Sequence, residues 1–187
     1  MSHAHDQTLL ARLGFQDPDR KTPDHDLACR YLSQRDQLRK IVALYLPFSE
    51  RWGAYGNHPT RDIAFDMCAA GSALLECPLT KGEGRYKTHI GFVDLVAKFD
   101  VFSSVHKERS AISIAIEVKI APIDVSTILR QLNLYKQYTT TDPKWLLVTA
   151  FEIDIEEIKT LGNVRHVYLN PDYKSFASQP KAKSQVI

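Results

Sequence analysis

The sequence predicts an α/β fold in which a mixed β-sheet is flanked by helices. Apolar residues recur at helical spacing in residues 24–47, three strand-like segments follow between residues 73 and 120, and helices then alternate with strands up to residue 169. The resulting order of elements is α, β-β-β, α, β, α, β. Such an order is typical of a mixed sheet with helices packed against it.

The composition is that of an ordinary soluble globular protein. The 187 residues are 44% apolar and carry a net charge of +2, which permits one well-packed domain and an anionic partner. The three cysteines, Cys29, Cys68 and Cys77, are scattered, so we expect neither a disulfide framework nor a zinc site, and a cytoplasmic location. No apolar run approaches the ~20 residues that span a bilayer, so we expect no membrane association.

The first 72 residues are predicted to form an N-terminal helical extension. Residues 1–23 are polar and rich in turn residues, and we interpret them as a surface arm. From Asp24 the helical spacing predicts one long amphipathic helix, or two in succession, with Asp24 or Asp26 as the N-terminal cap. After a loop, a short helix is expected over residues 61–70, between Thr60 as its cap and Gly71.

Residues 73–170 are predicted to form the core domain, and residues 171–187 a basic flexible tail. The elements expected in the core are strands at 73–79, 89–101 and 111–120, a helix at about 124–138, a strand at 144–150, a helix at about 155–161 and a strand at 164–169. Asp124 and Asp154 are the expected caps of the two helices. The apolar run at 144–150 is typical of an interior strand that is covered on both faces.

The strand at 111–120 has two different faces. Alternation places Ile112, Ile114, Ile116, Val118 and Ile120 on one of them. The other face has small side chains until Glu117 and Lys119, whose Cα atoms are about 7 Å apart. An ordinary explanation of this pair is an exposed ion pair at a strand edge, worth about 0–1 kcal/mol.

Asp94 stands in an otherwise apolar stretch, residues 90–97, and a buried aspartate needs a partner. A hairpin between this strand and the next would bring Asp94 level with Glu117. Two carboxylates ~5 Å apart repel by about 3 kcal/mol at an effective dielectric constant of about 20, and a single lysine relieves this less well than a divalent cation does. The pair therefore predicts a Mg²⁺ site, in which Mn²⁺ can substitute, with Lys119 beside it to hold water or stabilise charge on phosphorus.

The helix expected after this strand carries a glutamine on its apolar stripe. Ile128, Gln131, Leu132 and Tyr135 follow the spacing i, i+3, i+4, i+7, so Gln131 faces inward. A buried glutamine must be hydrogen-bonded. We expect Gln131 to reach the carboxylates, the water on the metal or a phosphate.

Asp94, then Glu117-Val118-Lys119 after a hairpin, then a glutamine and a tyrosine four residues apart on the next helix, resembles the PD-(D/E)XK nuclease superfamily. The QxxxY element is similar to that of its RecB-like branch. The resemblance implies a restriction-endonuclease-like αβββαβ core, metal coordination by Asp94 and Glu117, a catalytic role for Lys119, and active-site organisation by Gln131 and Tyr135. Glu76, on the first strand, would match an additional acidic metal ligand of many members, or else lie on the solvent side.

The function expected from these residues is that of a Mg²⁺-dependent deoxyribonuclease, an endonuclease in defence, restriction, repair or recombination. DNA is the expected partner, while RNA as a substrate, a homodimer and a larger protein complex stay open. The alternative is a catalytically inactive nucleic-acid-binding or assembly module on the same fold. Such modules usually lose one of the acids or the lysine, whereas this chain retains all three.

Overall fold

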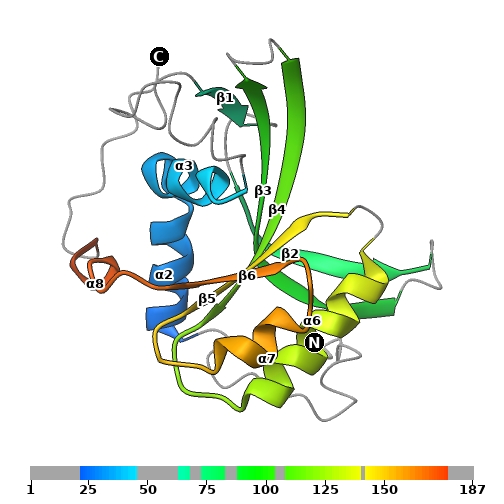
Figure 1. Ribbon diagram of the computed structural model, residues 1–187. Coiled ribbons are helices and arrows are strands. Elements are labelled where there is room, and N and C mark those ends of the chain that lie inside the picture. Colours follow the sequence, from blue (N-terminus) through cyan, green and yellow to red (C-terminus); the bar gives the residue numbers. More distant parts are fainter. Residues whose placement is uncertain are drawn as a thin grey trace, which may run out of the picture.

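The computed structural model describes residues 22–45, 63–67, 73–82, 88–103, 108–139 and 142–176. In this part of the chain a mixed β-sheet is flanked by helices, which confirms the predicted α/β class (Figure 1). The strands are β1 (Ile63–Met67), β2 (Leu74–Lys81), β3 (Thr88–Ser103), β4 (Glu108–Lys119), β5 (Lys144–Thr149) and β6 (Val164–Tyr168). The helices are α2 (Pro23–Leu32), α3 (Arg35–Ala43), α6 (Val125–Tyr138), α7 (Ile155–Lys159) and α8 (Tyr173–Phe176).

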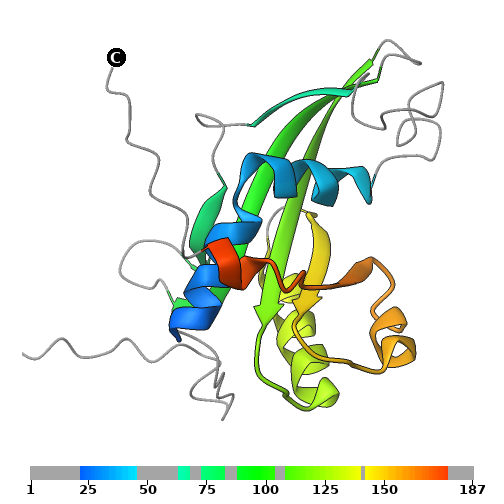
Figure 2. The same cartoon turned by 90° about the vertical axis from the view of Figure 1, so that its left-hand side faces the viewer.

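The strands follow one another in the order β1-β3-β4-β5-β6, and β2 also pairs with β3. β1, β2 and β4 are antiparallel to β3, whereas β4, β5 and β6 are parallel to one another. The long β3–β4 hairpin extends past the helices to the end that β1 borders (Figure 2). β4, which carries Glu117 and Lys119, is therefore an interior strand of the sheet rather than an edge.

β3 pairs with different strands along its length, and its pairing with β4 ends partway along it. Its pairing with β4 runs from Ser103 opposite Glu108 to Leu95 opposite Ile116. Its N-terminal half continues alongside β2, from Val96 to Thr88. The two central strands therefore separate just beyond Leu95.

Each face of the sheet has its own core. On one face Ile114, Ile116 and Val118 of β4 pack with α2 and α3, so the isoleucine-rich face of the strand is buried as predicted. On the other face Ala115 lies in a cluster with Ile128 of α6. β5 contributes to both clusters, which confirms that it is covered on both sides. No helix in the described ranges is both long and apolar enough to cross a bilayer.

The N-terminal helical segment consists of two helices in succession, α2 and α3, as one of the two expectations had it. The expected cap was wrong, because Thr22 rather than Asp24 or Asp26 caps α2: its Oγ1 accepts a hydrogen bond from the backbone N–H of His25 at 3.2 Å. Pro23 explains the difference, since proline lacks an N–H and its fixed φ suits the first helical position.

Two further expectations about secondary structure differ from the structure. The helix predicted at 61–70 is wrong, because Ile63–Met67 form β1 along the far end of β3, where an extended partner strand is available. Within the expected flexible tail, Tyr173–Phe176 form α8, which packs against α2 and buries Tyr173. Residues 1–21 of the expected arm and the whole of the loop expected at residues 47–60 lie outside the described residues.

Candidate functional site

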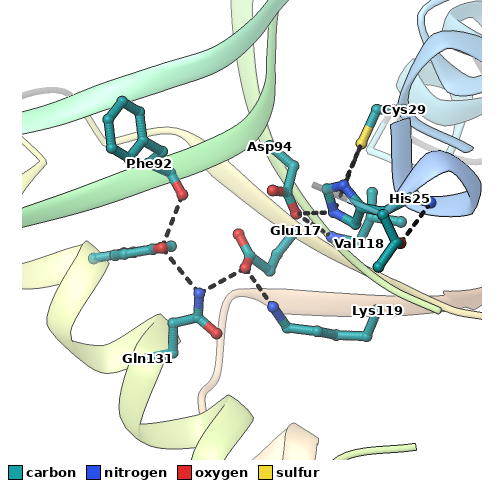
Figure 3. A network of polar contacts seen from close by, with 10 residues as sticks. His25, Cys29, Phe92, Asp94, Glu117, Val118, Lys119 and Gln131 are labelled. Atoms are coloured by element: carbon teal, nitrogen blue, oxygen red, sulfur yellow. Dashed lines mark hydrogen bonds and ion pairs between the residues drawn. The ribbon is translucent and has the colours of Figure 1, made fainter. Parts of the chain in front are cut away.

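The candidate site lies where β3 and β4 separate (Figure 3). Asp94 precedes Leu95 in β3 and Glu117 follows Ile116 in β4, so each acid is one residue beyond the last pair of the ladder, as the predicted level arrangement requires. Asp94 is only 7% exposed, and its Oδ2 accepts a hydrogen bond from the backbone N–H of Val118 at 2.8 Å. The carboxylate thus satisfies a backbone group of β4 at the point where strand pairing ends.

Glu117 and Lys119 form a buried ion pair at the C-terminal end of β4. Glu117 is 1% exposed and Lys119 is 0% exposed, and the lysine Nζ donates to Glu117 Oε1 at 2.8 Å. The explanation as an exposed pair at a strand edge is therefore wrong. Because breaking a buried pair leaves a desolvated charge, each partner depends strongly on the other.

Gln131 connects α6 to this pair. Its Nε2 donates to Glu117 Oε1 at 2.7 Å and lies 2.9 Å from the hydroxyl oxygen of Tyr135. The tyrosine hydroxyl in turn donates to the carbonyl of Phe92 at 2.8 Å, in the part of β3 that has left β4. The inward glutamine is thus satisfied, and α6 is tied to both separated strands.

Burial, together with the charge of Glu117, raises the pKa of Tyr135, so its hydroxyl keeps the proton that it donates. Replacing Tyr135 with Phe is expected to lower the free energy of unfolding by about 1–3 kcal/mol, because Gln131 loses an acceptor and Phe92 loses a donor in a buried place. Urea unfolding measures this change. Tyr138→Phe, a half-buried tyrosine at the end of the same helix, is the control, and equal midpoints for the two variants would contradict the bridging role.

His25, which the sequence reasoning missed, also belongs to the site. It lies on α2 at 4% exposure, and its Nε2 is 3.4 Å from Asp94 Oδ2 (Figure 3). Burial alone would lower the pKa of His25, but the hydrogen bonds with Asp94 and Cys29 and the charge of Asp94 outweigh it and raise this pKa. Since burial raises the pKa of the Cys29 thiol, the thiol is uncharged at neutral pH and Asp94 is the charge that matters.

The raised pKa of His25 predicts a pH dependence of stability in the metal-free chain. The folded state keeps a proton that the unfolded state releases above about pH 6.5, so the stabilisation is complete below that pH and is lost as the pH rises through the raised pKa. Between pH 6.5 and 8 in EDTA, the free energy of unfolding of the wild type should fall relative to that of His25→Gln. A constant difference between the two proteins over this range would contradict the His25–Asp94 pair.

Each carboxylate of the site therefore has its own cation. His25 lies against Asp94, and Lys119 lies against Glu117. The sequence pointed to Lys119 alone as a positively charged side chain near the two acids, and His25 supplies a second positive charge from the opposite face of the sheet. Four elements, α2, β3, β4 and α6, meet in this cluster, which we call the fork cluster: His25, Asp94, Glu117, Lys119, Gln131 and Tyr135.

The donors of the fork cluster fit Mg²⁺ in kind and number. Mg²⁺ takes one or two carboxylates and keeps water or phosphate at its other positions, and Asp94 and Glu117 supply two carboxylates from rigid strands. His25 lies next to Asp94 as a cation, because its pKa is raised, so its ring offers no free lone pair to a metal. In the described part of the chain, no three His, Cys, Asp or Glu side chains are grouped so that they could hold a metal ion. The two carboxylates would therefore be the only ligands that the described residues supply to Mg²⁺.

Glu76 lies apart from the buried residues. It stands on β2 between Leu75, opposite Leu95, and Cys77, opposite Val93, and so it is level with Asp94. Its side chain is exposed, and its φ of +48° is in the left-handed region that non-glycine residues seldom adopt. A role for Glu76 as an additional metal ligand stays a prediction.

Comparisons of the chain with protein-family models, with curated proteins and with solved structures found no match. Of the six residues predicted for the site, five lie in the fork cluster and Glu76 lies on the neighbouring strand.

Proposed function

We propose that the chain is a metal-dependent nuclease that hydrolyses phosphodiester bonds of DNA, on a restriction-endonuclease-like core of the PD-(D/E)XK type. One observation carries the proposal: Asp94, Glu117, Lys119 and Gln131 come from three separate segments and lie in one buried, hydrogen-bonded cluster where two strands diverge. A protein whose only need is stability seldom buries two acids and a lysine in this way, because apolar residues of similar volume are often at least as stable.

Asp94 and Glu117 would hold the Mg²⁺ or Mn²⁺, and His25 would stay beside Asp94 as its positively charged partner. When bound, the metal would activate water and neutralise charge on the phosphate. Lys119 would place its ammonium next to the water or the charge that develops on phosphorus. Gln131 donates to the same Glu117 oxygen as Lys119 does, so together they fix the orientation of that carboxylate.

A catalytically inactive binding or assembly module is the second candidate, and one observation favours it. Glu117 and Lys119 are 1% and 0% exposed, and each acid already has a cation, so the cluster is closed as it stands. A nuclease must admit phosphate to these groups. A purely structural cluster would stay closed and would bind no divalent metal.

The proposal is tested by incubating the purified chain with supercoiled plasmid, linear duplex and single-stranded circular DNA, in Mg²⁺ and in Mn²⁺. Cleavage of at least one substrate, abolished by EDTA, is the expected result, because the two acids cannot act on phosphate without the metal. The plasmid and the circle report endonucleolytic cutting, and the linear duplex also reports cutting from ends. Intact DNA in all three cases with both metals would refute the proposal.

A further inference from the structure

A pocket of about 420 Å³ lies beside the fork cluster, on the face of the sheet that α6 covers. Its floor includes Val96 and Ala115, which are opposite each other on β3 and β4, and the next pair on that face, Lys98 and Ser113. Glu117 is two residues beyond Ala115 on the same strand, about 7 Å away along it. The pocket and the proposed catalytic carboxylate thus share one strand face.

The walls of the pocket are apolar and aromatic. β2 and α6 are in contact along one side of it, and from them come Leu79, the half-buried Cys77 and the ring of Tyr138. Trp145 of β5 and Thr139 also line the pocket. An apolar slot of this volume, with an aromatic ring and a few hydroxyl groups, suits a flat heteroaromatic group such as a nucleobase.

Positive charge lies at the margin of the pocket. Lys98 is exposed and lines it, and the Nζ of Lys81 lies 5.3 Å from the centre of the Tyr138 ring. A nucleotide with its base in the slot has a phosphate on each side. One of these phosphates would lie near the lysines, and the other would lie near the fork cluster. Phosphate contacts of this kind position a strand, while the slot contacts the base.

We infer that this pocket receives an unpaired nucleobase from the nucleotide next to the scissile phosphate. The inference rests on the proposed nuclease function and specifies its substrate as single-stranded or locally unpaired DNA. A base within a duplex is stacked and paired, so it would have to be extruded before it entered the slot, whereas a single strand offers its bases directly.

Alkylation of Cys77 tests the inference on the wild-type chain without any cleavage. In EDTA, the rate at which N-ethylmaleimide modifies Cys77 is followed by peptide mass spectrometry, alone and with saturating decathymidylate. There are two matched controls. One is a decamer of abasic nucleotides, which has the same phosphates but no bases. The other is a fully paired DNA hairpin whose loop is a short non-nucleotide linker, so that it has no unpaired base. Decathymidylate should slow the modification roughly tenfold, because a base stacked in the slot covers Cys77, and the controls should slow it by less than about twofold.

Equal protection by the abasic decamer, or no protection by decathymidylate, would overturn the pocket assignment. The outcome is separate from that of the nuclease proposal. If Cys77 were protected in a chain that cuts no DNA, the base-binding pocket would be supported and the nuclease proposal refuted. If the chain cut DNA in a metal-dependent way without protection of Cys77, the nuclease proposal would be supported and the pocket assignment refuted.

A variant that fills the slot extends the test to cleavage. Ser113→Phe should reduce the preference for single-stranded over duplex DNA roughly tenfold, because its ring occupies the place of the base. Ser175→Phe, on the exposed surface of α8, should leave the preference unchanged. If both variants retained activity and had equal preferences for single-stranded DNA, the assignment of the pocket as a base-binding site would be contradicted.

Discussion

Replacing Lys119 with Met is expected to reduce DNA cleavage by at least roughly 10²-fold and to lower the free energy of unfolding in EDTA by about 3–5 kcal/mol. The lysine is fully buried, and its ammonium is 2.8 Å from Glu117 Oε1. Methionine fills a similar volume but removes the cation, so a buried carboxylate loses its charge partner. Plasmid cleavage and urea unfolding measure the two effects.

Two further variants make this result specific. Lys144→Met changes an exposed lysine on the neighbouring strand and should alter neither property. In the double variant Glu117→Gln with Lys119→Met, both charges are absent, so most of the stability should return while cleavage stays lost. If the single variant cut DNA as well as the wild type, Lys119 would have no catalytic role.

Replacing Asp94 with Asn is expected to weaken Mg²⁺ binding by more than about 10²-fold and to abolish cleavage. The amide oxygen of asparagine can still accept the hydrogen bond from the N–H of Val118, so the strands keep their arrangement while the negative charge is lost. Isothermal titration calorimetry with Mg²⁺ and Mn²⁺ measures the affinity directly.

Asp142→Asn, which changes an exposed acid ahead of β5, is the matched control for metal binding. The same calorimetry separates the two candidate functions. A binding or assembly module would give no heat that disappears in Asp94→Asn, and equal metal affinities in wild type and Asp94→Asn would place any bound metal elsewhere.

The strands of the site could be predicted because their requirements are local. An aspartate within an apolar strand needs a partner, and a hairpin with a turn of known position sets which residue lies level with it, so Asp94 and Glu117 followed from residue order alone. Gln131 was predicted in the same way, from a polar residue on an apolar helical stripe.

His25 was missed although the same signal was present in α2. His25, Ala28, Cys29 and Leu32 follow the spacing i, i+3, i+4, i+7 and are all buried, so the histidine is the polar residue of an apolar stripe. What the sequence does not tell is which face of the sheet receives α2. That depends on packing against Ile116 and Val118, some ninety residues along the chain.

β1 was predicted wrongly for a different reason, because its local sequence signals conflict. Residues 63–67 alternate Ile, Phe and Met with smaller or charged residues, which suits a strand, but the flanking Thr60 and Gly71 favoured a helix. The strand exists beside the far end of β3, whose length exceeds that of β2. Such pairing is set by distant residues, and local preferences do not determine it.

The most direct test of the central claim, that the fork cluster is a metal-dependent nuclease site, compares the wild type with the Glu117→Gln, Lys119→Met double variant on supercoiled plasmid. The two proteins, purified identically and of similar stability, are incubated in Mg²⁺ and in Mn²⁺. The wild type should nick or linearise the plasmid and the double variant should leave it intact. Equal cutting by both, or no cutting by the wild type in either metal, would contradict the claim.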